Sequence, residues 1–163
     1  MFYLELFRKL EAAKIRYMLV DGLAMNLHGV PRATMDVDLV LTFDVQNLKS
    51  FLALADTLQL KPVAPVSLSG LLDPVQRKKW TDEKHMIAFA RRPPDIQGPT
   101  VDVLIDPPMD IEKVLTRAVW RDVQGVRIPL ISVEDLIQLK EKSGRLQDRS
   151  DIEHLRRIMK KPL

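Results

Sequence analysis

The sequence contains no cysteine, which excludes disulfide bonds, zinc–thiolate sites and thiol chemistry. It also lacks any uninterrupted apolar run of membrane-spanning length. The N-terminal stretch, residues 2–14, is interrupted by charged residues, so we do not expect a signal peptide. The histidines show no mutual spacing that suggests a metal site. We therefore expect a cytoplasmic protein with no membrane partner.

Neither sign of charge dominates, because 25 Lys and Arg residues face 22 Asp and Glu residues, for a net charge of +3. This mild excess does not identify a nucleic-acid binder by itself, although it agrees with a polyanionic substrate. A chain of 163 residues is long enough for one domain with a real core but hardly for two. With no repeat or linker in view, we expect one domain over residues 1–163, with an α/β core over 1–131 and C-terminal helices over 132–163.

Apolar periodicity predicts an α+β fold (α/β in the broad sense), a mixed β-sheet flanked by helices. Helices are expected over residues 2–14, 22–28, 48–58, 111–118, 132–142 and 147–160. Strands are expected over residues 17–20, 35–42, 85–91, 100–105, 119–123 and 126–131. Residues 91–95 would form a hairpin tip, and the aperiodic residues 61–82 a loop with short helical pieces.

Two carboxylates, Asp36 and Asp38, lie inside the apolar run of residues 35–41. On a strand they would share one face, about 7 Å apart, where like charges repel each other and lose hydration. A cation makes this arrangement tolerable, and a divalent metal is the best candidate. The alternative is a solvated strand end at which arginines pair with both carboxylates.

A third carboxylate, Asp102, lies in the middle of a predicted Val/Leu/Ile strand, where a charge is costly without a partner. It can converge with Asp36 and Asp38 if the two strands are neighbours in the sheet. Oxygen ligands of this kind suit Mg²⁺, which binds one or two carboxylates together with substrate phosphates. Asp106 competes with Asp102 for this role, and an exposed edge-strand position for Asp102 stays possible.

Such a site favours phosphoryl or nucleotidyl transfer from a nucleoside triphosphate (NTP). The turn at Gly22, just after the predicted strand 17–20, would offer backbone N–H groups to phosphates. Arg32 and Thr34 would orient the substrate or order their loop. Equally, Arg32 could pair with Asp36 or Asp38 in the metal-free state.

The order of these motifs resembles the nucleotidyltransferase superfamily that includes polymerase β, and in particular its minimal bacterial members. Residues 17–24 (YMLVDGLA) match the strand and glycine turn, and residues 36–38 (DVD) match the Asp-x-Asp motif. Residues 27–34 (LHGVPRAT) and the tail at 132–151 look like the AbiEii-type toxin branch. The resemblance covers residues 17–155, with 61–84 unmatched.

The resemblance implies a set of site residues, with Mg²⁺ or Mn²⁺ as the cofactor. The implied catalytic residues and metal ligands are Asp36, Asp38 and Asp102, and the implied nucleotide-binding residues are Gly22, Arg32, Thr34, Lys140, Asp148 and Asp151. Lys140 would contact the phosphates, whereas simple local pairing with Arg145 or Arg149 explains Asp148 and Asp151 equally well. The chain departs from the family at Asp21, which stands where the first motif glycine is expected.

The implied reaction moves NMP from an NTP to an acceptor hydroxyl on tRNA, a protein or a small molecule. A toxin role with a cognate antitoxin also follows from the resemblance. A second hypothesis is a protein that binds nucleotide or a partner without turnover, because Asp21 brings negative charge to the phosphate turn. A third is an RNA-binding adaptor that uses the basic residues 77–80 (RKKW), which more simply form a solvated loop.

Overall fold

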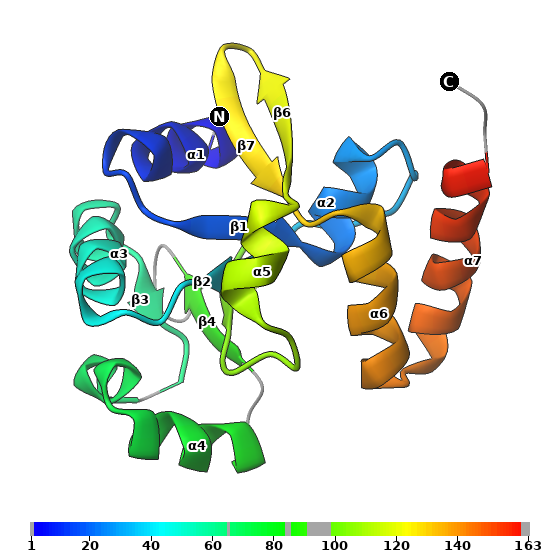
Figure 1. Cartoon of the computed structure of the whole chain (residues 1–163). Helices are drawn as coiled ribbons and strands as arrows, with labels where there is room; N and C mark the ends of the chain where they lie inside the picture. The colour runs from blue at the N-terminus through cyan, green and yellow to red at the C-terminus, as the bar shows by residue number, and fades with distance from the viewer. Residues whose placement is uncertain (1, 65, 84–85, 91–98, 161–163) are drawn as a thin grey trace.

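This computed structural model describes residues 2–64, 66–83, 86–90 and 99–160, and helices and strands follow one another through these ranges (Figure 1). The helices are α1 (Phe2–Ala12), α2 (Asp21–Leu27), α3 (Val45–Thr57), the 3₁₀ helix η1 (Leu68–Leu72), α4 (Pro74–Glu83), α5 (Ile111–Thr116), α6 (Val133–Ser143) and α7 (Leu146–Lys160). The strands are β1 (Tyr17–Val20), β2 (Val37–Leu41), β3 (Lys61–Pro62), β4 (Met86–Ala90), β5 (Val101–Leu104), β6 (Val119–Val123) and β7 (Val126–Leu130).

The strands form one mixed sheet in the order β3-β4-β5-β2-β1-β7-β6. The central strand β2 pairs antiparallel with β1 and parallel with β5, and β1 pairs parallel with β7. The outer pairs β3–β4, β4–β5 and β6–β7 are antiparallel. The predicted mixed sheet is therefore confirmed, and the strands that carry Asp38 and Asp102 are direct neighbours.

The core lies on the central strands because their residues are apolar on both faces. Every residue of β1 and β2 is buried, as expected for strands covered by helices on either side. Helix α1 adds its apolar stripe, in which Leu6, Phe7 and Leu10 are buried. The interior position of Asp38 on β2 is thus a charged exception in a hydrophobic environment.

The helix boundaries follow recognisable caps. Asp44 accepts a hydrogen bond from the backbone N–H of Asn47 at the start of α3. Ser132 caps α6 by accepting from the backbone N–H of Asp135, so this helix begins where the sequence predicts it. Gly144 ends α6 in the left-handed conformation that glycine adopts most readily.

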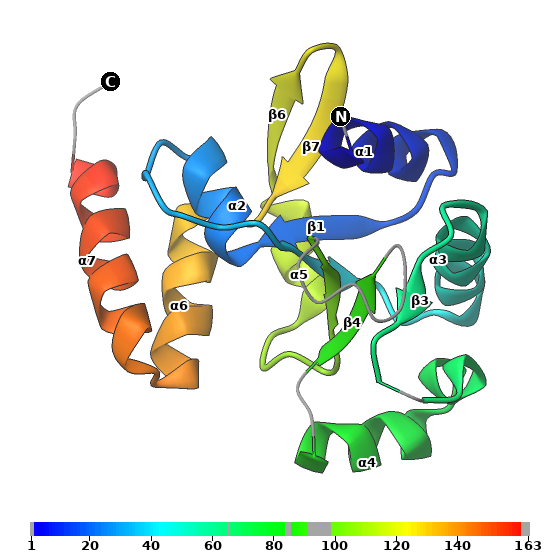
Figure 2. The same ribbon diagram turned by 180° about the vertical axis from the view of Figure 1, so that it is seen from behind.

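The C-terminal helices α6 and α7 pack side by side at the end of the sheet where β1 continues into α2 (Figures 1 and 2). Helices α1 and α3 lie at the opposite side of the molecule in both views. Residues far apart in the sequence therefore meet where β1 ends: the start of α2, the end of β5 that carries Asp102, and the two C-terminal helices.

The predicted loop over residues 61–82 is wrong in part, because this segment contains β3, η1 and most of the ten-residue helix α4. Helix α4 has no amphipathic pattern to reveal it, and it is anchored by Trp80, which is buried. Arg77 is also buried and donates a hydrogen bond to the carbonyl oxygen of Leu71. The RNA-binding hypothesis loses both its stacking residue and one of its cations, since only Lys78 and Lys79 are exposed.

Two further predictions bear on membranes and on the β4–β5 hairpin. Among the helices of the described ranges, none combines the length and the apolar character needed to cross a membrane. Strands β4 and β5 are paired as predicted, whereas the predicted hairpin tip at residues 91–95 lies outside the described residues.

Candidate active site

Three carboxylates gather at the paired ends of β2 and β5. The parallel register places Asp38 directly opposite Asp102, and on its other side Asp38 faces Val20 of β1. Asp36 immediately precedes β2, and its Oδ1 accepts a hydrogen bond from the backbone N–H of Thr100 at 3.2 Å. The convergence predicted from the sequence is therefore present for Asp38 and Asp102, with Asp36 held at the strand entrance.

These carboxylates are poorly compensated in electrostatic terms. Asp38 and Asp102 are both buried, each with 8% of its surface exposed. Burial raises the pKa of Asp38 to about 7, and the neighbouring charges of Asp21, Asp102 and Asp36 add to the rise. Burial also raises the pKa of Asp102, although the hydroxyl of Thr100 donates to its Oδ1 at 2.7 Å and opposes this shift.

No cation lies within ion-pair distance of Asp36, Asp38 or Asp102 among the residues that the structure describes. The alternative in which Arg32 pairs with Asp36 or Asp38 is therefore wrong. The competing carboxylate Asp106 is partly exposed and lies 3.8 Å from the Nε of Arg77, so it does not join this group. Thr100 is a hydrogen-bond partner of Asp36 and Asp102, but the strand-end carboxylates have no ion-pair partner in the described ranges.

The carboxylate oxygens of Asp36, Asp38 and Asp102 are the kind of ligand that a hard divalent cation prefers. They do not form a complete coordination sphere by themselves. Within the described part of the chain, no group of three or more His, Cys, Asp or Glu side chains is arranged to hold a metal ion. Mg²⁺ needs no such cage, because it binds through one or two carboxylates and takes its other ligands from water and substrate phosphates. Asp38 and Asp102, adjacent on neighbouring strands, are the residues best placed to supply those carboxylates.

A second polar cluster surrounds Lys140 of α6, whose side chain is only 3% exposed. Its Nζ lies 2.8 Å from Asp21 Oδ1, 2.9 Å from Asp151 Oδ2 and 3.3 Å from Asp148 Oδ1. Burial opposes the charged form of Lys140, yet Asp21 and Asp151 hold its pKa above the ordinary value. The cluster joins the end of β1 to both C-terminal helices.

Arg32 connects this cluster to the loop before β2. Its Nη1 lies 3.3 Å from Asp21 and its Nε lies 3.5 Å from Asp151. The loop approaches α2 closely at Gly22, where an added Cβ would lie 3.0 Å from both Cβ and Oγ1 of Thr34. The absence of a side chain at Gly22 thus lets the segment that contains Arg32 and Thr34 pack against the start of α2.

Arg145, at the turn between α6 and α7, completes the cluster. Its Nε lies 3.0 Å from Asp148 and its Nη2 lies 3.6 Å from Asp21. Asp148 also accepts a hydrogen bond from the hydroxyl of Ser143. Burial works against the ionised forms of Asp21 and Asp148, but the surrounding donors and cations lower the pKa of both carboxyls.

The structure thus places the predicted site residues in two adjoining groups rather than one. Asp36, Asp38 and Asp102 form the first group. The second group contains Lys140, Asp148, Asp151 and Arg32, with Gly22 and Thr34 beside it. The sequence predicted the local pair of Arg145 and Asp148, which is present, but it did not indicate that both residues also belong to the environment of Asp21. No local spacing reports that contact, because its members come from opposite ends of the chain.

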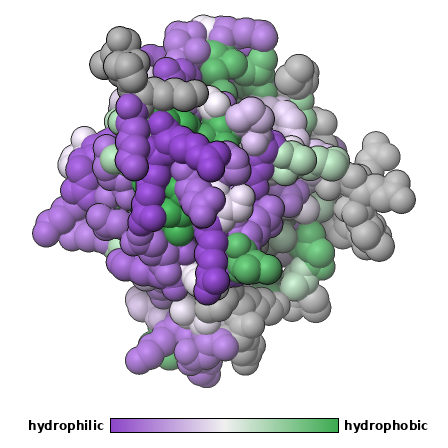
Figure 3. Space-filling view, turned by 90° about the vertical axis from the view of Figure 1, so that its right-hand side faces the viewer, coloured by the Kyte–Doolittle hydropathy of each residue, from purple (hydrophilic) through white to green (hydrophobic). Residues whose placement is uncertain are grey.

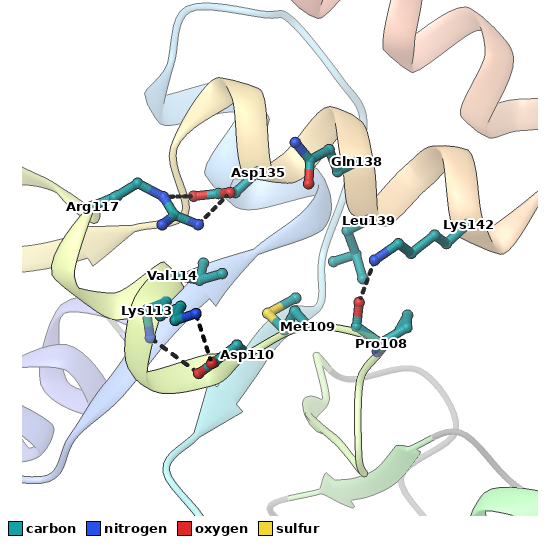
Figure 4. Close-up of a pocket in the computed structure, with 10 residues that line it drawn as sticks. All are labelled: Pro108, Met109, Asp110, Lys113, Val114, Arg117, Asp135, Gln138, Leu139 and Lys142. Atoms are coloured by element: carbon teal, nitrogen blue, oxygen red, sulfur yellow. Dashed lines mark hydrogen bonds and ion pairs between the residues drawn. The ribbon is translucent and has the colours of Figure 1, made fainter.

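A separate pocket of about 130 Å³ opens between α5 and α6 (Figure 4). Its walls combine apolar side chains such as Met109 and Val114 with charged ones on the rim. Arg117 makes two hydrogen bonds to Asp135 there, and Lys142 donates to the carbonyl oxygen of Pro108. None of the strand-end carboxylates lines this pocket, so it is distinct from the candidate active site.

The profile of a protein family described as "nucleotidyl transferase of unknown function (DUF2204)" matches residues 100–163 of the chain. This region includes Asp102 and both C-terminal helices, but not Asp36 or Asp38. No curated protein matched the chain in a sequence comparison.

Three solved structures share the overall architecture. A Thermotoga maritima protein assigned to the nucleotidyltransferases superposes with a TM-score of 0.59 at 18% identity, covering 91% of this chain and 86% of that one. The lincosamide antibiotic adenylyltransferase LnuA, bound to lincomycin, gives 0.59 at 16% identity, with 96% and 94% covered. An antigenic nucleotidyltransferase-like protein of Paracoccidioides brasiliensis gives 0.56 at 20% identity, with 94% and 71% covered. The chain therefore has the nucleotidyltransferase fold.

Proposed function

We propose that this protein is a metal-dependent nucleotidyltransferase that moves NMP from an NTP to an acceptor hydroxyl. The observation that carries the proposal is the pairing of Asp38 with Asp102 across adjacent parallel strands, where buried carboxylates have no cationic partner in the described ranges. In a protein with the nucleotidyltransferase fold, a divalent cation and its bound nucleotide explain why such a costly arrangement is kept.

Each residue of the candidate site has a separate role in this proposal. Asp36 and Asp38 would hold Mg²⁺ or Mn²⁺, and Asp102 would complete the ligand set and accept the proton of the acceptor hydroxyl. The bound metal would neutralise the triphosphate and stabilise the leaving pyrophosphate. The hydrogen bond from the Thr100 hydroxyl would keep the Asp102 carboxylate oriented toward the reacting group.

The second cluster would supply the phosphate-binding cations. Lys140, Arg32 and Arg145 surround Asp21 next to the strand-end carboxylates. Gly22 and Thr34 would set the position of the Arg32 loop, and Asp148 and Asp151 would hold Lys140 in place. The acceptor stays open between tRNA, a protein and a small molecule; the lincomycin bound to LnuA makes small hydroxylated compounds a sensible first panel.

The experiment is a transfer assay with each of the four α-³²P-labelled NTPs, Mg²⁺ or Mn²⁺, and a cell extract as the source of acceptors. We expect label transfer by the wild-type protein, loss of at least about a hundredfold in Asp38→Asn, and a similar loss on chelation of the metal. Asp56→Asn is the matched control, because it makes the same charge change at an exposed position on α3, away from the site. Transfer that persists in Asp38→Asn and in EDTA would refute the proposal.

A second candidate is a protein that binds nucleotide without turnover. It is favoured by Asp21, which already neutralises Lys140 where a phosphate is expected to bind. Saturable, metal-dependent NTP binding with no label transfer to any acceptor would support it over the enzyme.

Membership of the AbiEii-type branch and a toxin role with an antitoxin partner stay predictions. The toxin role is tested by expression in cells: wild type should arrest growth, whereas Asp38→Asn should not.

A further inference from the structure

The carboxylate of Asp21 is shared by three cations from separate parts of the chain. Its Oδ1 lies 2.8 Å from Lys140 Nζ and 3.3 Å from Arg32 Nη1, and its Oδ2 lies 3.6 Å from Arg145 Nη2. Lys140 belongs to α6, Arg32 to the loop between α2 and β2, and Arg145 to the turn between α6 and α7. Convergence of several Lys and Arg donors on one small anion is also how proteins bind a phosphate group.

The charge balance of the cluster depends on Asp21. The three cations face three carboxylates, those of Asp21, Asp148 and Asp151. Asp148 and Asp151 are almost fully buried between α6 and α7, whereas the side chain of Asp21 is 28% exposed. If Asp21 leaves, the remaining groups carry one net positive charge, and that charge faces a position open to solvent.

The position of Asp21 links the cations to the strand-end carboxylates. Asp21 directly follows Val20, which is the register partner of Asp38, and its charge contributes to the raised pKa values of Asp38 and Asp102. Its backbone is left-handed, with φ of 60°, a conformation that Asp tolerates and glycine prefers. An anion at the position of the Asp21 carboxylate therefore contacts the cations and also acts electrostatically on the proposed metal ligands.

The face that carries α7 is largely hydrophilic, with smaller hydrophobic areas between the polar ones (Figure 3). Arg145 is 63% exposed by its side chain and Arg32 is 20% exposed. A polyanion arriving from solvent can therefore reach both guanidinium groups without unfolding the C-terminal helices. Lys140 is only 3% exposed, and of its three carboxylate partners Asp21 is the most exposed.

We propose that Asp21 is an internal competitor for the substrate: its carboxylate occupies the position of a substrate phosphate, and the triphosphate of the incoming nucleotide must displace it from Lys140, Arg32 and Arg145. The proposal rests on the proposed function for the identity of the ligand, a nucleoside triphosphate. The internal competitor predicts that Asp21 weakens nucleotide binding, so that the wild-type protein needs a higher nucleotide concentration for half-saturation than the Asp21 variants do.

The test compares wild type with Asp21→Asn, Asp21→Gly and the charge-matched control Asp56→Asn. Equilibrium binding of ATP and of inorganic tripolyphosphate is measured by calorimetry at low ionic strength, with circular dichroism and a thermal melt to verify folding. We expect both Asp21 variants to bind each ligand at least about tenfold more tightly, because one like charge next to a phosphate is removed. Asp56→Asn should change neither affinity by more than about twofold, since its charge is exposed and screened.

A double variant identifies where the gain arises. Adding Arg145→Gln to Asp21→Asn should remove most of the gain, because one of the cations released by the substitution is lost; Arg145 is exposed, so folding should be kept. Unchanged affinity in both folded Asp21 variants would overturn the inference. An equal gain in Asp56→Asn would also overturn it, since the effect would then follow net charge and not this cluster. If Asp21→Asn does not fold, Asp21→Gly, which suits the left-handed backbone, gives the answer.

Failure of this inference is distinguishable from failure of the proposed function. Label transfer that requires Asp38, together with unchanged ligand affinity in the Asp21 variants, would refute the internal competitor and leave the enzyme standing. Tighter tripolyphosphate binding in Asp21→Asn without any label transfer would refute the enzyme and leave the internal competitor standing.

Discussion

Replacing Lys140 by methionine should destabilise the protein strongly, because Lys140 is the central cation among buried carboxylates. Its Nζ is within 3.3 Å of oxygens of Asp21, Asp148 and Asp151. Methionine matches the length of the lysine stem but removes the charge, so the remaining cationic partners are Arg145 for Asp148 and Arg32 for Asp151. The substitution therefore tests electrostatics with little change in packing.

The magnitude follows from distance and burial. At 3 Å and an effective dielectric constant of about 20, each contact represents roughly 5 kcal/mol of Coulomb attraction. Most of this energy is offset by the cost of removing the charges from water, so the measured loss is that of breaking a buried ion pair, about 3–5 kcal/mol. Such a loss is a large part of the roughly 5–15 kcal/mol that stabilises a typical domain.

The assay is urea unfolding followed by circular dichroism at pH 7.5 and again at pH 4.5. Lys142→Met serves as the matched control, since Lys142 lies one half-turn further along α6, is exposed, and donates only to the carbonyl oxygen of Pro108. We expect Lys142→Met to lose less than about 0.5 kcal/mol. The loss in Lys140→Met should shrink at pH 4.5, because Lys140 helps to lower the pKa of Asp21 and of Asp148, and without it these two carboxyls take up protons more readily. A loss below about 1 kcal/mol at pH 7.5 would show that the cluster does not stabilise the docked helices.

Two further predictions concern the strand ends. In the metal-free protein the pKa of Asp38, about 7 when folded, lies above its ordinary value, so the folded state binds the extra proton between about pH 4 and pH 7. The free energy of unfolding should therefore fall as the pH rises through that window, by at most about 4 kcal/mol. Asp38→Asn should lose this part of the pH dependence and unfold at a higher urea concentration than wild type at pH 8. A wild-type free energy of unfolding that rises with pH through this window would contradict the prediction. Gly22→Ala should cost about 1–3 kcal/mol in urea unfolding, because the new Cβ meets Thr34 at 3.0 Å, and a loss under about 0.5 kcal/mol would mean that the loop shifts freely.

Local signals in the sequence identified much of the fold and one part of the site. The apolar strand pattern around Asp36 and Asp38 and the helical periodicity over residues 132–142 and 147–160 predicted elements that the structure contains. These signals are legible because they depend on neighbours a few residues apart. Helix α4 was missed because it has no such local signal: it has no repeating apolar stripe, and it is held in place by the burial of Trp80.

Partner choice among charged side chains was decided by the tertiary structure alone. The sequence presented Asp21 as an unexplained carboxylate at a glycine position, and Lys140 as a helix lysine near acidic residues. Only the packing of α6 and α7 beside the end of β1 brings Lys140 to 2.8 Å from Asp21. Likewise, the sequence specified that Asp38 and Asp102 each lie on an apolar strand, but the strand order and register placed them opposite one another. Local residue patterns indicate which segments form most of the strands and helices, whereas the electrostatic environment of a buried charge also depends on residues far away in the sequence, such as the partner of Lys140 that lies 119 positions away.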